Sequence, residues 1–442
     1  MSARYHEELR SVAVRLLTEA LVFDERGEPC GVVASAADTA SHYGNVWTRD
    51  NVAPMLHFLR HDPPKVARFL EALLRRQSQS RRTAGLIPIG FAPRSERIDY
   101  GGEEAIGAIH SVDSTLWFLV LLGLYVETTG DVAWLRQHRA GFKAALDLVL
   151  APRFDPLPLV AAPESTTEID RPSGLHGYPL QLQVLAALAL RWGARLLGRL
   201  GRRAEEAQFC RAEAEAIGSW VNRWYWLDRA TLAERLALGT ESHGPGNPNP
   251  FNLDYARLGG QTAVLRETGY LAGTLRAGHI DGRFWSFANC LAAASGILPE
   301  ARAAAVVKTV RANRHQLLGR MPLAVCWPHL DGVEYEIVMN SDPRGRPGHF
   351  HNGAHWPNIL WILTAAALGA GDAALAREAL DLAAAGLPPH WAEYYDRRGV
   401  PGNGTRLRQS WSIAGFLVAR DALAAPDDRP YWQIRLQPAG GW

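Results

Sequence analysis

The sequence predicts an all-α protein that folds as an (α/α)6 barrel, a toroid of six helical hairpins. Apolar residues recur at helical spacing in about twelve segments, and strand-like alternation is almost absent. The helices come in pairs, in which a helix that is apolar all round precedes one with a single apolar stripe, as expected of an inner and an outer layer. Short links join the helices of a pair and long polar loops join successive pairs. The active site is therefore expected on the long-loop rim.

The first half of the chain contains seven of these predicted helices. An apolar stripe of Val and Leu marks the first, two prolines at Pro63-Pro64 open the third, and Asp131 caps the fifth. Ser111 is the predicted N-cap of the fourth, which puts Asp113 in its first turn, just before a long apolar run. The predicted ranges are 4–22, 51–60, 63–79, 113–129, 131–149, 178–200 and 203–223.

The second half continues the same alternation of paired helices and long loops after a Pro/Asn/Gly-rich loop at 241–250. Two further long loops, at 341–353 and 388–407, precede the last hairpin and the last helix. No motif recurs with a fixed period, which disfavours a helical solenoid. We expect residues 1–442 to form one domain. The predicted ranges are 282–296, 299–313, 356–370, 372–386 and 410–423.

Composition narrows the class of protein. The net charge is +2 and the pI about 8.4, and no Lys/Arg stripe suggests a nucleic-acid partner. No apolar run has membrane length, and the polar N-terminus lacks a signal-peptide core. The four cysteines lie far apart, which suits free thiols in a reducing compartment. We therefore expect a cytoplasmic protein that works without membrane or nucleic acid.

Four of the long loops combine carboxylates with Trp, Tyr or His side chains. Sugars present apolar ring faces to aromatic groups and hydroxyls to polar ones. Two carboxyl groups can then act as acid and base in glycoside hydrolysis. The loops contain, in chain order, Trp47, Arg49 and Asp50; Asp99, Glu103, Glu104, His110 and Asp113; His349, His351, Asn352, His355 and Trp356; and Trp391, Glu393, Tyr394, Tyr395, Asp396 and Gln409.

Each of these groups also has a simpler interpretation. Asp113 taken alone could be an ordinary helix-start carboxylate that interacts with the helix dipole. His349, His351 and His355 could form a metal site, but no thiolate or third-helix ligand is apparent, so we expect no metal and no cofactor. A Trp in these loops could equally be part of the core.

Seven ordered motifs resemble the neutral/alkaline invertase family of inverting glycoside hydrolases, known from cyanobacteria and plants. The resemblance extends from about residue 43 to 419, and the motifs occur in family order. They are VWTRD at 46–50, EAIG at 104–107 with VDS at 112–114, IDR at 169–171 with GYPLQLQ at 177–183, HIDGRFW at 279–285, HNG at 351–353 with WP at 356–357, EYYD at 393–396 and QSWSIAG at 409–415.

The resemblance implies cleavage of sucrose to glucose and fructose at the glucosyl carbon. Asp113 would be the general acid and Glu393 the general base. A catalytic acid must carry a proton when substrate is bound, which burial would favour. Further residues are expected to bind the glucosyl unit or to stack on it, and they are Trp47, Arg49, Asp50, Arg171, Asp281, Arg283, Trp285, His351, Asn352, Trp356 and Gln409.

The chain departs from the family pattern mainly where the leaving group is expected to bind. Residues 163–168 read PESTTE where the family has DGSCM, and Gly282 stands in place of Phe. Another small α-glucoside is therefore an alternative to sucrose, and a non-catalytic sugar-binding barrel is a second alternative. A barrel cyclase or lyase would be expected to show an acidic or Cys/His metal cluster, and neither is evident. The resemblance also suggests a homo-oligomer.

Overall fold

The protein is described by a computed structural model. It covers residues 3–95, 97–101, 111–151, 156–201, 204–232, 262, 265–267, 269–276 and 279–426. Three residues singled out from the sequence (Glu103, Glu104 and His110) and the loop at 241–250 lie outside this described part.

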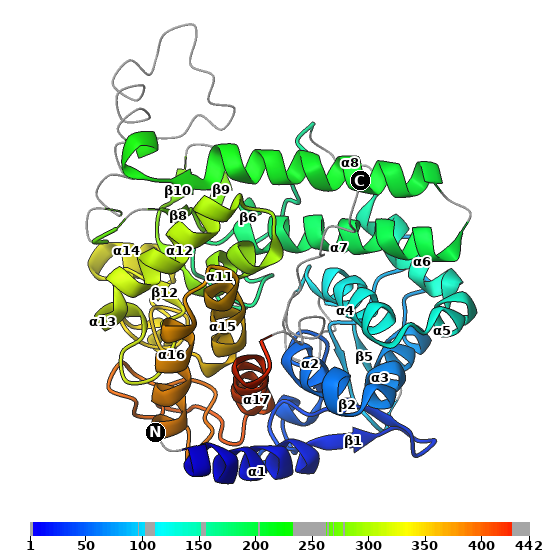
Figure 1. The fold of residues 1–442 in the computed structure, drawn as a ribbon, viewed down its shortest axis with the longest axis horizontal. Coiled ribbons are helices and arrows are strands. Elements are labelled where there is room, and N and C mark those ends of the chain that lie inside the picture. Colours follow the sequence, from blue (N-terminus) through cyan, green and yellow to red (C-terminus); the bar gives the residue numbers. More distant parts are fainter. Residues whose placement is uncertain are drawn as a thin grey trace, which may run out of the picture.

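Helices dominate the described residues, as the sequence predicts (Figure 1). Their bounds agree with most of the predicted ranges to within a few residues. The helices are α1 (Ala3–Glu19), α2 (Val52–His61), α3 (Pro63–Arg75), α4 (Ser114–Thr129), α5 (Val132–Gln137), α6 (Arg139–Val149), α7 (Leu180–Leu200), α8 (Ala204–Trp220), α11 (Ser286–Ser295), α12 (Glu300–Ala312), α13 (Arg314–Leu317), α14 (Gly332–Val338), α15 (Leu360–Gly369), α16 (Ala373–Gly386) and α17 (Ser410–Ala424).

Two predictions of helix detail are wrong. The helix expected at 131–149 is broken at His138, whose φ of −99° and ψ of 15° end α5 and begin α6. The N-cap of α4 is Asp113 and not Ser111, and the Asp113 side chain makes no capping hydrogen bond. Its carboxylate is therefore available for contacts beyond the helix end.

Six of the helices contact one another in a closed cycle. The order of contact is α2, α4, α7, α11, α15 and α17, and α17 returns to α2 (Figure 1). Burial explains this inner position: every residue of α4 from Ser114 to Val126 is buried, and so is every residue of α15 from Leu360 to Ala367. Helices with polar residues on one face cannot be buried in this way without large desolvation costs.

Each cycle helix packs against a neighbour in sequence that lies outside it. The helix α16 buries Leu375, Ala376, Ala379, Leu380 and Ala383, a single stripe at helical spacing. Between α15 and α16 the link is a Gly371-Asp372 turn, in which Gly371 has a φ of 76° and Asp372 accepts a hydrogen bond from the backbone N–H of Leu375. Gly130 and Asp131 form the equivalent link between α4 and α5.

Short antiparallel strands lie in the long loops. Most have two or three residues, too few for the alternation that sequence reading detects. They are β1 (Leu21–Phe23), β2 (Pro29–Val32), β3 (Val46–Trp47), β4 (Gly90–Phe91), β5 (Ile98–Asp99), β6 (Tyr178–Pro179), β7 (Trp226–Leu227), β8 (Tyr270–Leu271), β9 (Thr274–Arg276), β10 (His279–Asp281), β11 (Phe284–Trp285) and β12 (Cys326–Trp327).

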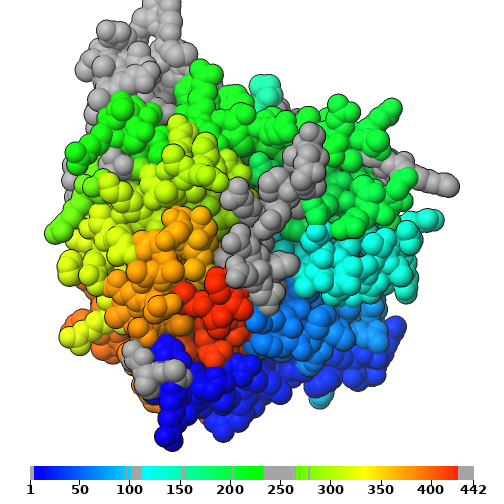
Figure 2. All heavy atoms as spheres, viewed as in Figure 1, coloured from blue at the N-terminus to red at the C-terminus, as the bar shows by residue number. Residues whose placement is uncertain are grey.

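One continuous hydrophobic cluster runs from Leu9 to Ala422. It includes residues from all six helices of the cycle. In Figure 2 the α17 segment (red) lies between the α16 region (orange) and N-terminal segments (blue). Among the described helices, none is both long enough and apolar enough to cross a bilayer.

Candidate active site

The N-terminal ends of the cycle helices carry most of the polar residues that the sequence singles out. Arg49 and Asp50 lie in the turn between β3 and α2, Asp113 caps α4, and Gln409 caps α17. Glu393 lies in the loop that joins α16 to α17. The same end receives the long loops.

Arg49, Asp50 and Glu393 border a cleft, which we call the outer cleft. It has about 460 Å³ of atom-free space including its open mouth. Its wall is both aromatic and acidic. The lining residues are Ala34, His42, Tyr43, Trp47, Arg49, Asp50, Ile89, Ser111, Asp170, Glu393 and Trp411.

Asp113 is fully buried, and it contacts two residues that line this cleft, Ser111 and Arg49. Its Oδ2 accepts from Arg49 Nη1 and from Gln181 Nε2, both at 3.4 Å. Its Oδ1 accepts a short hydrogen bond from the hydroxyl of Ser111, which lines the cleft. Three donors on three different segments therefore fix the orientation of the carboxyl group.

Glu393 is 5% exposed and is held from two sides. The hydroxyl of Tyr43 lies 3.2 and 3.3 Å from its two carboxylate oxygens, and Gln409 Nε2 donates to Oε1 at 3.3 Å. Burial raises the pKa of Glu393 to about 8, and the negative charge of Asp170 adds to the rise. The hydrogen bonds from Tyr43 and Gln409 oppose it, because they stabilise the ionised form.

Arg49 is the cation that contacts this acidic group of residues. Its Nη2 lies 3.7 Å from Asp170 Oδ2, and its Nη1 also donates to the backbone carbonyl of Thr167. Burial lowers the pKa of Arg49, but the neighbouring carboxylates, Asp113 first among them, outweigh burial and raise the pKa above its ordinary value. The guanidinium therefore stays charged. Burial likewise raises the pKa of Asp50 to about 7 and that of Glu168 to about 8.

The acidic cluster therefore keeps protons at neutral pH. Burial raises the pKa values of three of its carboxyl groups, to about 7 for Asp50 and to about 8 for Glu168 and Glu393. Ionising all of them without solvent would be costly, and a proton held by one makes it easier for its neighbours to ionise. A group of this kind can both give and accept protons, as acid–base catalysis requires.

The loop at 164–174 is tied to the catalytic region by its backbone. Val112 donates to the Thr166 carbonyl at 3.0 Å, and the Glu168 N–H donates to Gln181 Oε1 at 3.1 Å. Glu164 closes the loop on itself, because Oε1 accepts from the backbone N–H groups of Ser173 and Gly174, at 2.8 and 3.0 Å. Asp170 and Glu168 thereby reach the site from a segment that is not part of any helix.

A second cavity adjoins the outer cleft, and we call it the inner chamber. It shares Arg49, Asp50 and Trp411 with the cleft and has about 360 Å³ of atom-free space including any open part. Trp117, Phe287 and Trp361 meet edge to face along its wall, with ring centroids 6.2 Å apart in each pair. The lining residues are Arg49, Asp50, Val52, Ala53, Trp117, Glu168, Phe287, Asn358, Trp361 and Trp411.

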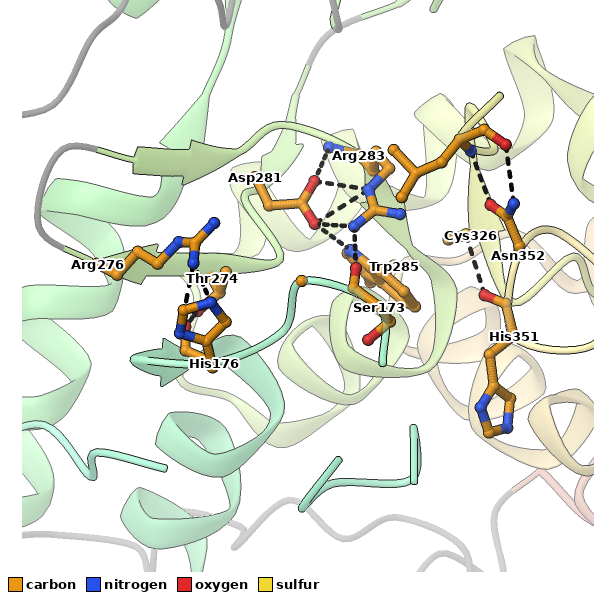
Figure 3. Close-up of polar contacts among 12 residues, drawn as sticks. Ser173, His176, Thr274, Arg276, Asp281, Arg283, Trp285, Cys326, His351 and Asn352 are labelled. Atoms are coloured by element: carbon orange, nitrogen blue, oxygen red, sulfur yellow. Dashed lines mark hydrogen bonds and ion pairs between the residues drawn. The ribbon is translucent and has the colours of Figure 1, made fainter. Parts of the chain in front are cut away.

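Some predicted sugar-binding residues instead hold loops together in this ligand-free structure. Arg283 donates to both oxygens of Asp281 and to the Ser173 carbonyl at 2.6 Å, and Trp285 Nε1 donates to Asp281 at 3.0 Å (Figure 3). Burial raises the pKa of Asp281, but Arg283 outweighs it and holds the pKa below its usual value. One donor of this buried pair, Arg283 Nη1, has no partner.

Asn352 uses all its polar groups on the backbone. Its Nδ2 donates to the carbonyls of Leu330 and Gly345, both at 2.8 Å, and its Oδ1 accepts from the Leu330 N–H at 2.7 Å (Figure 3). Trp356 is buried and stacks on Tyr394, with ring centroids 5.6 Å apart. Neither residue lines the two cavities.

His351 and Arg171 lie at the margin of the acidic cluster. His351 is 2% exposed, its Nδ1 is 3.9 Å from Asp170 Oδ1, and burial lowers its pKa to about 4, so the imidazole is neutral at physiological pH. Arg171 is exposed, and its charge acts at a distance on His42 and on the buried His351.

The histidines of the loop before α15 do not meet. His355 Nδ1 bonds to the Met321 carbonyl, whereas His351 stacks on Phe350. Among the described residues, one His/Cys/Asp/Glu group has metal-ligand spacing, and it is His57, His61 and Asp421, between α2 and α17. His61 and Asp421 are joined by a hydrogen bond of 2.7 Å.

Several site residues were not found from the sequence. Tyr43 precedes the first motif, and nothing in its surroundings marks it as a partner of Glu393. Asp170 lies within the IDR motif, where Arg171 drew attention instead. Glu168 and Trp411 lie in or beside sequence motifs of the family, but the sequence does not indicate that their side chains line the inner chamber. An acidic residue directly before IDR was the available signal for Glu168.

Comparisons with known proteins identify the family. The alkaline and neutral invertase family matches residues 13–426. Alkaline/neutral invertase CINV1 of Arabidopsis thaliana is 32% identical over 91% of this chain and 77% of its own length. Cytosolic invertase 1 of Oryza sativa subsp. japonica is 30% identical over 93% and 77%.

Solved structures share the fold. A GH63 mannosylglycerate hydrolase from Thermus thermophilus, in complex with glucose, matches with a TM-score of 0.62 at 17% identity, over 93% of this chain and 99% of that one. A wild-type protein described as a glycosidase matches with a TM-score of 0.60 at 14% identity, over 96% and 99%. The family match and the long similarity to plant enzymes lead to one conclusion. This chain belongs to the alkaline and neutral invertase family and is a glycoside hydrolase.

Proposed function

We propose that the protein is an inverting hydrolase that cleaves sucrose at the glucosyl carbon, with one catalytic domain built as an (α/α)6 barrel. The observation that carries this proposal is the outer cleft. The cleft is lined by Glu393 and by Ser111, and the Ser111 hydroxyl donates a hydrogen bond to Asp113. Family membership supports a sugar substrate, and the invertase names of the relatives support sucrose.

In the proposed reaction Asp113 protonates the glycosidic oxygen while that bond breaks. Glu393 takes a proton from a water molecule, whose oxygen bonds to the anomeric carbon from the opposite face. The products of an α-glucoside are then β-glucose and the protonated leaving group, which is fructose when sucrose is the substrate. Solvent returns the proton from Glu393 to Asp113 before the next turnover.

The protonation of Glu393 bears on these roles. A pKa of about 8 leaves Glu393 mostly protonated at pH 7 and mostly ionised above pH 8. A base must be ionised, so activity should increase with pH through this range. Tyr43 and Gln409 favour the ionised form and are suited to a base.

The same pKa also favours a second assignment, in which Glu393 is the acid and Asp113 the base. The two assignments differ in their response to a leaving group that needs no protonation, such as fluoride. If Asp113 is the acid, Asp113→Asn should lose sucrose hydrolysis but keep hydrolysis of α-glucosyl fluoride, and Glu393→Gln should lose both. The opposite pattern would exchange the roles.

The remaining sugar-binding roles follow from position. We propose that Trp47, Arg49 and Asp50 contact the substrate, because they line the outer cleft. Gln409 acts through its bond to Glu393, and His351 through Asp170. Asp281, Arg283 and Asn352, with Trp356 and Arg171, are proposed to support the walls of the subsite and to complete it when a ligand is bound.

Product analysis tests the reaction. The protein is incubated with sucrose and with a panel of other small α-glucosides, and the anomer first released is identified by NMR. Early β-glucose from sucrose supports the whole proposal. Early β-glucose from another glucoside alone would keep the mechanism and change the substrate, and early α-glucose would refute inversion. Sugar binding without turnover of any glucoside would favour a non-catalytic sugar-binding barrel.

We also propose a cellular location and an oligomeric state for the protein. A cytoplasmic location is supported by the name of the rice relative, cytosolic invertase 1. Related plant proteins include chloroplastic and mitochondrial forms, so fractionation of the source cells is the direct test. A homo-oligomer remains a proposal that sedimentation of the purified protein would check.

A further inference from the structure

The inner chamber combines an aromatic wall with polar atoms that lack partners. Five of its lining residues each have one buried polar atom without a hydrogen bond in this structure. Three of these atoms are donors, on Arg49 Nε, Trp117 Nε1 and Trp411 Nε1. Two are acceptors, Glu168 Oε2 and Asn358 Oδ1.

Unpaired buried polar atoms are costly, so a group of five around one cavity indicates an absent occupant. The occupant must offer both donors and acceptors, because the wall contains both. It must also present an apolar face, because Trp117, Phe287 and Trp361 form much of the wall. A pyranose ring has these properties, with hydroxyls at its rim and C–H groups on its faces.

Glu168 differs from the other four residues in where it comes from. It lies on the loop at 164–174, whereas the others lie on the cycle helices or directly before them. The loop is fixed beside the catalytic region, because Gln181 accepts from the Glu168 N–H and donates to Asp113, and Arg49 donates both to the carbonyl of Thr167 and to Asp113. A rigid backbone beside the acid holds the Glu168 carboxyl at a fixed place in the chamber.

We propose that the inner chamber holds the pyranose ring of the substrate and that Glu168 selects it, by a hydrogen bond between its carboxyl group and one ring hydroxyl. This inference rests on the proposed function, since it concerns the sugar that is transferred to water. The carboxyl group can accept a hydrogen bond from the hydroxyl when it is ionised, or donate one to the hydroxyl when it is protonated. Burial raises the pKa of Glu168 to about 8, which makes both forms accessible near neutral pH.

A binding cycle with deoxy sugars tests this contact directly. Affinities for glucose and for its 2-, 3-, 4- and 6-deoxy analogues are measured by calorimetry for the wild-type chain and for Glu168→Met, which keeps side-chain length but removes the polar atoms. In the wild type, one deoxy sugar should bind about tenfold or more weakly than glucose, as expected for loss of a hydrogen bond to a buried carboxyl group. We call the loss of affinity of each deoxy sugar, relative to glucose, its penalty. In Glu168→Met this one penalty should disappear, and the other three should be unchanged.

Two further variants control the experiment. Glu168→Gln keeps a hydrogen-bonding group of the same shape and should keep part of the selected penalty. Glu164→Gln changes the other glutamate of the same loop, whose carboxylate bonds to Ser173 and Gly174, and should leave the pattern of penalties intact. Should Glu168→Met fail to fold, Glu168→Ala, which also removes the polar atoms, provides the same comparison.

The outcomes separate this inference from the proposed reaction. Equal deoxy penalties in the wild type and in Glu168→Met would overturn it, as would failure of the wild type to bind any pyranose from a panel of monosaccharides. A selective loss of one penalty supports it even when sucrose itself is not hydrolysed. Conversely, sucrose hydrolysis with unchanged penalties keeps the reaction and removes Glu168 from the subsite.

Discussion

Tyr43 shares its phenolic hydroxyl between the two carboxylate oxygens of Glu393, at 3.2 and 3.3 Å. The two residues lie 350 positions apart in the sequence, and the contact joins the first long loop to the last. Because the donor favours the ionised carboxylate, Tyr43 lowers the pKa of Glu393 against the effect of burial. The residue thus helps to decide the pH at which the site is active.

Replacing Tyr43 by Phe should move the pH profile of kcat/KM upward. Loss of one hydrogen bond to a charged group is worth about 1.5–3 kcal/mol, which corresponds to a rise of about one to two units in the pKa of Glu393. If Glu393 is the base, the acid limb moves to higher pH, and if it is the acid, the alkaline limb moves. Tyr125→Phe is the matched control, because Tyr125 donates to Asp131 at 3.0 Å away from the cleft. A profile that does not move in Tyr43→Phe would contradict the assignment.

Asn352→Ala should destabilise the protein more than it weakens sugar binding. The side chain makes three buried hydrogen bonds to backbone groups, and their loss should cost about 3 kcal/mol. Urea unfolding measures this cost, and product inhibition by glucose measures binding in the same variant. Asn358→Ala is the comparison, because Asn358 Oδ1 has no partner and lines the inner chamber. The reverse ranking of the two variants would place Asn352 in direct contact with sugar.

Asp421→Asn should destabilise the junction between α2 and α17. Burial raises the pKa of Asp421, but the hydrogen bond with His61 and the His57 imidazole, whose Nδ1 is 3.5 Å from Oδ2, outweigh it and depress the pKa below its usual value. A depressed carboxyl pKa adds stability above the unfolded-state value near 4, and this stability is lost as pH falls below it. We expect a loss of about 2–4 kcal/mol at pH 7, measured by urea unfolding. Asp147→Asn, at an exposed carboxylate paired with Lys143, should change stability little.

His57 adds a second, milder pH dependence at the same junction. Burial lowers its pKa, so the unfolded chain binds a proton more readily than the folded one. Wild-type stability should therefore begin to decline as pH falls below about 6.5, before the carboxylate effect appears. His351 and His355, whose pKa values burial lowers to about 4, contribute to the same decline, so His57→Gln should reduce it without removing it. A decline as steep as that of the wild type would assign none of it to His57.

All four cysteines should be unreactive in the native protein. Each is buried and unpaired, and burial raises the thiol pKa to about 11 for Cys30 and Cys210 and to about 12 for Cys290 and Cys326. Only the thiolate reacts with disulfide reagents. A colorimetric thiol titration should find almost no reaction before unfolding and four thiols in guanidinium chloride. Rapid native reaction of any thiol would indicate local opening around it.

The helices were predictable because burial leaves a clear pattern in the sequence. The helices α4 and α15 are apolar all round, and the Gly-Asp pairs at 130–131 and 371–372 mark their short links. The break at His138 was not predictable, because the apolar stripe of α5 and α6 continues across it. The short strands were missed because two residues cannot show a period.

The candidate site was predictable only where one residue carries its own local signal. Asp113 has one, because it begins an apolar helix, whereas Glu393 was found through resemblance to a family. Tyr43, Glu168 and Asp170 reach the site through contacts between distant loops. Such contacts depend on tertiary packing, which no local sequence pattern records.

The return of the cycle from α17 to α2 sets an order of events during synthesis. The helix α2 ends at residue 61 and α17 begins at 410, so roughly 350 residues must be translated between them. At about 5–20 residues per second the ribosome needs roughly 20–70 s for this stretch. Throughout that interval the nascent chain holds apolar faces of α1 and α2 that α17 will later cover. A molecular chaperone that binds apolar surface would therefore have the longest time to bind at the faces that α17 later covers.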